Sequence, residues 1–336
     1  MRRQPEDAPV DAAAEAPLRD AAIHVIVNRA SGGQDADRLA QIRAGFAAAG
    51  AAERTRIEAV PGREMSARAR AAAEAGAGVV VACGGDGTIC AVAEGLAQAR
   101  AGGESGAALG VLPAGTFNYF ARGLGLPERI APAARIIAEG HTRPLATGAV
   151  NGRLFLNNAS IGVYPAILRE REQIYARFGR SRLAAYWSVL RVLRGFGGPL
   201  RLHIEADGRE IRTRSPLAFV AGSAYQLDLL GVDGAEAIRG GRLALLLAPD
   251  DHPGGLVRRA LRLGARRAER GEDYTLVAAR SIRIHAGPGA RLVARDGERA
   301  RMRGPFEFTL SAHALRAVVP AEGWAETPDA AAEAAA

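Results

Sequence analysis

The sequence has 336 residues, which is enough for two domains of about 100–200 residues each. It carries a net charge of +8 without any lysine, so a bound phosphate must be held by backbone N–H groups, arginine or metal. No apolar run reaches the length of about 18 residues that a spanning helix needs, and residues 1–20 lack the apolar stretch of a signal peptide. We therefore expect a cytoplasmic protein with disordered tails at 1–20 and 321–336.

Residues 21–148 alternate between short apolar runs and helical patterns. Strands are predicted at 23–28, 54–60, 78–83 and 108–115, and helices at 63–76 and from 89 onward. The run "GVVVAC" at 78–83 is wholly apolar, as in strands that are buried on both faces of a parallel sheet. This half is predicted to be an α/β nucleotide-binding domain with a mostly parallel sheet.

Residues 149–320 have a different character, because short strands with alternating polarity dominate. Asp-Gly turns inside 205–210 and 294–299 predict β-hairpins. We expect an antiparallel β-sandwich or flattened barrel with helical insertions at about 164–195 and 253–270. We leave open that the last strand of the chain returns to the sheet of the first domain.

The stretch "CGGDGT" at 83–88 follows a buried strand and precedes a helix, at the sheet edge where open α/β folds bind ligands. Glycines let backbone N–H groups approach an anion, and a helix N-terminus adds a positive dipole end. Asp86 fits if it binds a magnesium-linked water or accepts a hydrogen bond from nucleotide or acceptor. A tight turn with a solvated aspartate is the alternative for this motif alone.

Two further loops follow strands of the same sheet, "VNRASGG" at 27–33 and "PAGTFNYFARGLGLP" at 113–127. Together with "GGDGT" and the later "DGE" at 296–298, they resemble the bacterial diacylglycerol kinase–like lipid kinases, relatives of the sphingosine kinases. The resemblance covers about 22–320 and implies an ATP·Mg²⁺ site between an α/β domain and a β-rich lipid domain. It assigns to the nucleotide Asn28, Arg29, Ala30, Ser31, Gly32, Gly84, Gly85, Asp86, Gly87, Thr88, Thr116 and Asn118.

The same resemblance places Glu298 as proton acceptor, with Asp296 as its neighbour and Asp86 as the third catalytic residue. If 296–298 is part of an alternating strand, both carboxylates point to the same face of that strand. Both can then act on the same acceptor hydroxyl group. Without the family, an exposed hairpin turn is the favoured interpretation of this segment.

The sequence departs from the family at two places. Phe117-Asn118-Tyr119 stands where relatives often have Gly-Asn-Asp, and Arg239-Gly240 stands where an acidic residue of a structural magnesium site is usual. We expect Arg239 to replace that cation, so that the second metal site is absent; the ligands of the catalytic metal are not assigned.

The predicted function is an ATP-dependent lipid kinase of phospholipid metabolism that phosphorylates a hydroxyl of diacylglycerol or a related lipid. An NAD kinase–like enzyme and a catalytically impaired nucleotide- or lipid-binding protein remain alternatives.

Asn157 and Asn158 are candidates to orient the lipid head group. The arginine-rich amphipathic segments 164–198 and 256–270 suit either packing or peripheral contact with the inner membrane face. No nucleic-acid motif is present, and a homodimer is left open.

Overall fold

In the computed structural model, the described residues are 18–29, 35–103, 106–115, 117–178, 192, 198–250 and 252–321. Four of the predicted nucleotide-binding residues lie outside these ranges, as do most of both tails and much of the segment 179–197. The four are Ala30, Ser31, Gly32 and Thr116.

A parallel sheet forms the N-terminal half, in the order β2–β1–β3–β4. Its strands are β1 (Ile23–Asn28), β2 (Thr55–Val60), β3 (Val79–Gly84) and β4 (Ala108–Pro113). β3 and β4 are buried along their whole length, which explains the apolar run at 78–83. The α/β prediction for this half is confirmed.

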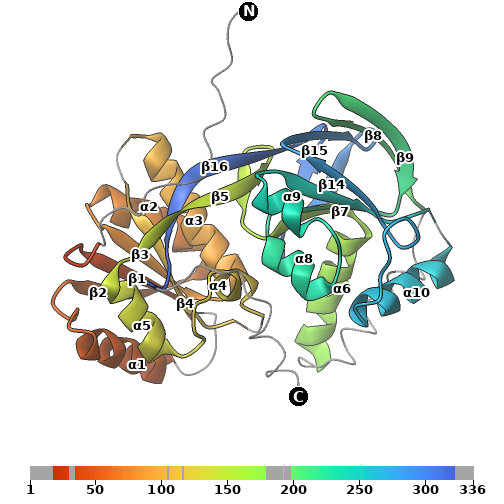
Figure 1. Ribbon diagram of the computed structural model, residues 1–336. Helices are drawn as coiled ribbons and strands as arrows, with labels where there is room; N and C mark the ends of the chain where they lie inside the picture. Colours follow the sequence, from red (N-terminus) through yellow and green to blue (C-terminus); the bar gives the residue numbers. More distant parts are fainter. Residues whose placement is uncertain are drawn as a thin grey trace, which may run out of the picture.

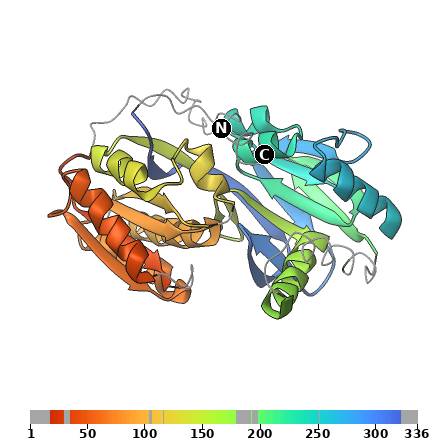
Figure 2. The same ribbon diagram turned by 90° about the horizontal axis from the view of Figure 1, so that it is seen from below.

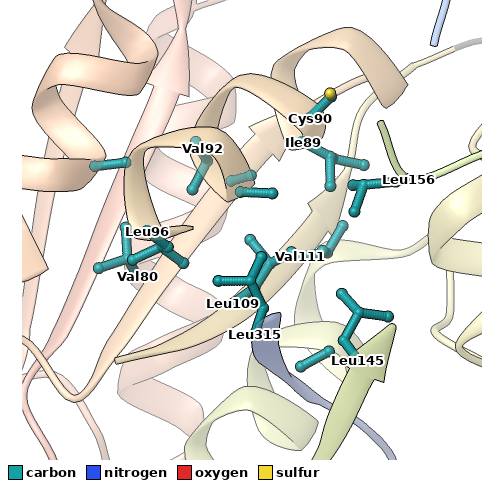
Figure 3. Close-up of a cluster of buried hydrophobic side chains, with 14 of the residues drawn as sticks. Val80, Ile89, Cys90, Val92, Leu96, Leu109, Val111, Leu145, Leu156 and Leu315 are labelled. Atoms are coloured by element: carbon teal, nitrogen blue, oxygen red, sulfur yellow. The ribbon is translucent and has the colours of Figure 1, made fainter. Parts of the chain in front are cut away.

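Helices cover both faces of this sheet. They are α1 (Asp35–Ala48), the 3-10 helix η2 (Gly62–Glu64), α2 (Met65–Glu74), α3 (Asp86–Ala101), α4 (Tyr119–Gly123) and α5 (Ile130–Glu139). α2 and α3 pack on one face, and α1 and α5 pack on the other. Successive residues of β3 alternate between the two cores, with Val80 facing α3 and Val81 facing α1. Figure 3 shows the core under α3, where Ile89 and Leu96 meet strand residues.

Two long strands, β5 (Thr142–Val150) and β16 (Phe306–Val318), connect the halves of the molecule. They run antiparallel beside one another (Figure 1). β16 pairs with β13 at its start and reaches β4 at its end, where Ala317 lies opposite Leu109. A register shift between Ser311 and Leu315 marks the crossing. The single ten-stranded sheet that results therefore runs through both halves.

The C-terminal half is a sandwich, not a barrel. Its second sheet has six antiparallel strands in the order β12–β11–β10–β7–β14–β15, and it packs on the β16–β13–β8–β9 part of the first sheet. The remaining strands are β6 (Arg153–Phe155), β7 (Asn158–Gly162), β8 (Leu200–Ala206), β9 (Arg209–Ser215), β10 (Leu217–Ala221), β11 (Leu243–Leu247), β12 (Thr275–Ala279), β13 (Ser281–His285), β14 (Ala290–Arg295) and β15 (Glu298–Arg303). Both predicted Asp-Gly hairpins form, at Ala206–Arg209 and Arg295–Glu298.

Four described helices accompany the sandwich: α6 (Val163–Phe178), α8 (Ala224–Leu230), α9 (Ala235–Arg239) and α10 (Pro253–Gly264). α6 and α10 begin inside the two predicted insertions, whereas α8 and α9 were not predicted. None of the described helices is long and apolar enough to span a membrane. Leu156 and Asn157 form a bend between β6 and β7.

Candidate active site

The glycine loop at 84–88 joins β3 to α3 and packs backbone to backbone against the loop after β4. A Cβ atom added to Gly115 would lie 2.5 Å from the Cα of Gly85, and one added to Gly85 would lie 3.2 Å from the Cα of Gly115. A side chain at Gly115 would force the two loops apart, and one at Gly85 would be tightly packed. Because Gly85 immediately precedes α3, the first-turn N–H groups of a 16-residue helix point out of this loop.

The loop after β1 is tied to the glycine loop by its first residue. Asn28 Nδ2 donates a hydrogen bond to Thr88 Oγ1 at 2.9 Å, and Thr88 is buried. Arg29 is exposed at the end of β1. These contacts bring the predicted residues Asn28, Gly84 and Thr88 together, while their roles toward a nucleotide remain predictions.

Asn118 acts within its own loop. It has a left-handed backbone (φ 50°), and its side-chain amide exchanges hydrogen bonds with Gly115, receiving from the N–H at 2.9 Å and donating to the carbonyl at 3.2 Å. Asparagine tolerates this conformation better than most residues. Its side chain is 4% exposed and braces the turn, so its role in nucleotide binding stays a prediction.

Asp86 opens α3, and its carboxylate holds the start of α4. Oδ1 accepts from Phe120 N at 3.0 Å and from Asn157 Nδ2 at 3.4 Å, and Oδ2 accepts from Tyr119 N at 3.3 Å. Burial raises the pKa of Asp86, and these hydrogen bonds oppose that rise. Asp86 therefore positions α4 and contacts the C-terminal half through Asn157.

Asp296 is the first residue of a two-residue hairpin turn (φ 45°), so it does not lie in an alternating strand with Glu298. Its carboxylate accepts backbone N–H bonds from Leu156 at 2.6 Å, Asn157 at 2.7 Å and Asn158 at 3.0 Å. Burial raises the pKa of Asp296, and the three N–H donors lower it. The expectation that both carboxylates face one way is thus wrong: Asp296 points into the protein and stabilises the turn before β7.

Glu298 is exposed, and its carboxylate reaches the glycine loop of the other half. A Cβ atom added to Gly87 would lie 3.0 Å from Glu298 Oε1. The DGE turn and the GGDGT loop therefore form one site, although 208 residues lie between Thr88 and Gly297 in the chain numbering. A carboxylate next to the N-terminus of α3 is favourably placed, because the helix dipole stabilises negative charge there.

Contacts behind the site hold the two halves together. Cys90 Sγ lies 3.5 Å from the carbonyl of Leu154, which also accepts a hydrogen bond from the Arg295 guanidinium. Arg295 in turn lies 3.9 Å from Glu94 of α3. Burial raises the pKa of Cys90, as expected for a packed, unreactive thiol. No sequence motif had indicated this set of contacts.

Beside these groups, three buried side-chain oxygens lack a hydrogen-bond partner: Asn157 Oδ1, Asn158 Oδ1 and Ser160 Oγ. Asn158 Nδ2 donates to Gln226 Oε1 of α8 at 2.9 Å. Asn158 and Ser160 share one face of β7, opposite to the sandwich core that contains Ala159 and Ile161. An unpaired buried oxygen costs about 1–3 kcal/mol, so this face is suited to receive hydrogen-bond donors. Sequence reasoning had missed Ser160 and Gln226.

The described residues contain no group of three or more His, Cys, Asp or Glu side chains placed to hold a metal ion. Mg²⁺ in nucleotide sites commonly uses one or two carboxylates plus substrate phosphates, so Glu298 and Asp86 are compatible with such a cation. At the position of the expected second metal, the Arg239 guanidinium lies 2.5 Å from Asp228 Oδ2 and links α9 to α8. That Arg239 replaces a metal ion, and that the second metal is absent, both remain predictions.

The chain is similar to several known proteins. Residues 22–150 match the diacylglycerol kinase catalytic domain. The "Probable lipid kinase YegS-like" of Pseudomonas aeruginosa strain UCBPP-PA14 is 52% identical over 89 residues, which is 26% of this chain and 28% of that protein. The diacylglycerol kinase of Bacillus subtilis is 37% identical over 133 residues, 39% of this chain and 42% of that protein. The matched segments thus span less than half of either relative.

The fold similarity extends further along the chain. A crystal structure of a diacylglycerol kinase from Bacillus anthracis has a TM-score of 0.64 at 21% identity, covering 89% of this chain and 97% of the other. A second structure from that organism has a TM-score of 0.70 at 23% identity, covering 90% and 98%. These structures show that both halves share the fold. Over residues 22–150 the chain thus resembles the diacylglycerol kinase catalytic domain, and over the remaining residues the similarity is one of fold.

Proposed function

We propose that the protein is an ATP-dependent lipid kinase that transfers the γ-phosphate of ATP to a hydroxyl of diacylglycerol or a related lipid. The observation that carries the proposal is the position of Glu298 against Gly87. A carboxylate from the β-rich half then stands at the N-terminus of α3, where we propose that the phosphates bind. The names of the relatives, lipid kinase and diacylglycerol kinase, favour a lipid acceptor over NAD.

The nucleotide phosphates would lie against the glycine loop and the N-terminus of α3, next to Asn28 and Thr88. Gly85 and Gly115 pack closely, so backbone N–H groups of these loops, together with Arg29, would bind the phosphates in a chain without lysine. Bound Mg²⁺ would neutralise charge on the phosphates. Glu298 would accept the proton of the acceptor hydroxyl, and Asp86 would keep α4 and Asn157 in place around that hydroxyl.

The acceptor end of the site is proposed at Asn157, Asn158 and Ser160, whose unpaired buried oxygens would accept hydrogen bonds from a head group. Beyond these polar atoms, the same side of the six-stranded sheet is apolar. Phe219, which lies opposite Ser160, packs edge-on against Tyr164 with ring centroids 6.1 Å apart. Phe219 is half-buried and packs against the apolar cluster under α8 and α9, so an apolar wall stands beside the polar atoms, which suits a lipid acceptor better than a dinucleotide.

The test uses radiolabelled ATP, Mg²⁺ and mixed micelles that contain a total lipid extract, followed by mass identification of the labelled product. We expect transfer by the wild type and a loss of about 10²–10⁴-fold in Glu298→Gln. The matched control is Glu210→Gln, an exposed hairpin glutamate far from the glycine loop, which should retain activity. Nucleotide binding without transfer would identify a binding protein, and labelled NADP in a parallel reaction supplied with NAD would identify the alternative kinase.

A further inference from the structure

Asn157 is the residue through which the β-rich half meets Asp86, and all but one of its polar groups have partners. Its N–H donates to Asp296 Oδ1 at 2.7 Å, and its carbonyl accepts from Gly222 N at 2.8 Å. Its side-chain Nδ2 donates to Asp86 Oδ1 at 3.4 Å. The remaining group, Oδ1, is buried and has no hydrogen-bond partner within the described part of the chain. Asn157 is therefore held at its backbone and its amide nitrogen, with one open acceptor.

The Asp86 carboxylate fixes which way the Asn157 amide points. A carboxylate oxygen only accepts, and both oxygens of Asp86 already accept backbone N–H bonds from the start of α4. The amide nitrogen must therefore face Asp86, and the amide oxygen must face away from it. Asn158, whose Nδ2 donates to Gln226 Oε1, has a second unpaired buried Oδ1. Ser160 adds a hydroxyl that can donate or accept, so it does not discriminate between ligand groups.

The open acceptor of Asn157 belongs to the part of the site where the two halves meet. Figure 2 shows the N-terminal half, in red to yellow, beside the β-rich half, in green to blue. Asp86 and Gly87 lie at the start of α3 in the first half, and Glu298 reaches Gly87 from the second. Asn157 also comes from the β-rich half, and it binds Asp86, one residue before Gly87. We therefore place its oxygen next to the hydroxyl that Glu298 would deprotonate.

Diacylglycerol has no hydrogen-bond donor to offer this acceptor. It carries one hydroxyl and two esters, and ester oxygens only accept. In the proposed transfer, the hydroxyl oxygen bonds to the γ-phosphorus while the bond from that phosphorus to the β,γ-bridging oxygen breaks. ADP leaves with that electron pair, and the hydroxyl proton goes to Glu298. A lipid with a further donor therefore gains a hydrogen bond to Asn157 Oδ1 that diacylglycerol cannot make.

We propose that the preferred acceptor lipid carries a second O–H or N–H donor on the carbon next to the reacting CH₂OH group, as monoacylglycerols and ceramides do. Asn157 Oδ1 accepts that hydrogen bond, and the second group takes no part in the bond changes of the transfer. The inference rests on the proposed function, because it names the class of lipid that the same site takes. Asn157 is then a specificity-determining residue.

The experiment compares two lipids with the same acyl chain and the same reacting hydroxyl. 1-Oleoylglycerol has a hydroxyl on the neighbouring carbon, and the monooleoyl ester of 1,3-propanediol lacks it. Transfer from radiolabelled ATP in mixed micelles should have a kcat/KM at least about tenfold higher for 1-oleoylglycerol, because a site built for a substrate hydroxyl rejects the analogue without it. A short-chain ceramide, compared with dioleoylglycerol, tests N–H as the donor. Equal values for the matched pair, together with a ceramide no faster than dioleoylglycerol, would overturn the proposal.

Asn157→Leu removes the acceptor at similar side-chain size. We expect the ratio of kcat/KM between the matched lipids to fall to about one in this variant, because neither lipid then has a partner to lose. A residue with only a structural role would lower both rates together and keep the ratio, and that result would refute the assignment to Asn157. Glu210→Gln, on the exposed β8–β9 hairpin, is the control and should keep the wild-type ratio. The lipid pair itself is compared on the wild type, so it does not depend on how the variant folds.

Binding is measured separately from transfer. Calorimetric titration of the two matched lipids in detergent micelles, without ATP, should show at least about tenfold tighter binding of 1-oleoylglycerol to the wild type. Donor-dependent binding without transfer would refute only the kinase activity. Transfer to both lipids at equal kcat/KM, with no preference for ceramide, would refute only the donor requirement. Neither transfer nor donor-dependent binding would refute both.

Discussion

At the scale of single residues, the two carboxylates of the DGE turn have different surroundings although they are two positions apart. Asp296 is buried and accepts three backbone N–H bonds, whereas Glu298 is exposed at the glycine loop. Asp296 is therefore suited to stabilising the fold, and Glu298 is suited to contacting a substrate. Sequence reasoning placed both in one site but assigned them a common face, because the partners of Asp296 come from the distant segment 156–158.

This difference predicts opposite results for two isosteric variants. Asp296→Asn should lower the free energy of unfolding by about 2–3 kcal/mol, because an amide leaves at least one of the buried N–H donors unpaired. Asparagine tolerates the left-handed backbone of position 296, so turn strain does not contribute. Glu298→Gln should change stability by less than about 0.5 kcal/mol. Urea unfolding measures both, and equal stabilities would contradict the structural role of Asp296.

At the scale of elements, the loops after β3 and β4 contact each other through Gly85 and Gly115. We expect this contact to position the backbone N–H groups that would bind the nucleotide phosphates. Gly115→Ala would place a methyl group 2.5 Å from the Cα of Gly85 and 2.8 Å from Asn118 Oδ1, so the two loops must separate. We expect ATP affinity to fall at least about tenfold, as for a misplaced set of phosphate donors. Gly106→Ala is the control, because an added Cβ there meets nothing within 4 Å. Titration calorimetry compares the two, and equal affinities would exclude this role.

The pairing of α8 with α9 tests whether an arginine has replaced a metal ion. Arg239 and Asp228 are partly exposed, so their ion pair contributes at most about 1 kcal/mol. We expect the melting temperature of the wild type to be unaffected by EDTA. Arg239→Asp would set two carboxylates side by side, and its lower melting temperature should rise again with millimolar Mg²⁺. A wild-type melting temperature that falls in EDTA would show that a structural metal is present after all.

At the scale of the whole molecule, local patterns predicted the elements better than their connections. The apolar run of β3 and the two Asp-Gly hairpins are local signals, and they were read correctly. The pairing of β5 with β16 joins residues more than 150 positions apart, and no local pattern encodes it. The same holds for the contact of Glu298 with Gly87, which only the family resemblance had indicated.

The end of β16 makes the N-terminal half dependent on the last part of the chain. Leu315, Ala317, Val318 and Val319 are each at most 2% exposed and lie in the two cores of the parallel sheet. Burying one Val or Leu side chain contributes about 1.5–3 kcal/mol, so losing this segment removes about 5 kcal/mol or more. That loss is comparable to the total stability of a typical domain, about 5–15 kcal/mol.

A fragment that ends at residue 148 should therefore fail to fold cooperatively, even though it contains the whole parallel sheet. The matched control carries residues 1–148 followed by a flexible linker and residues 314–320, which restores the strand beside β4 and β5. We expect circular dichroism to show a sharp thermal transition for the control and a broad one for the short fragment. A sharp transition in the short fragment would mean that the parallel sheet is stable alone, and that β16 connects two domains that fold independently.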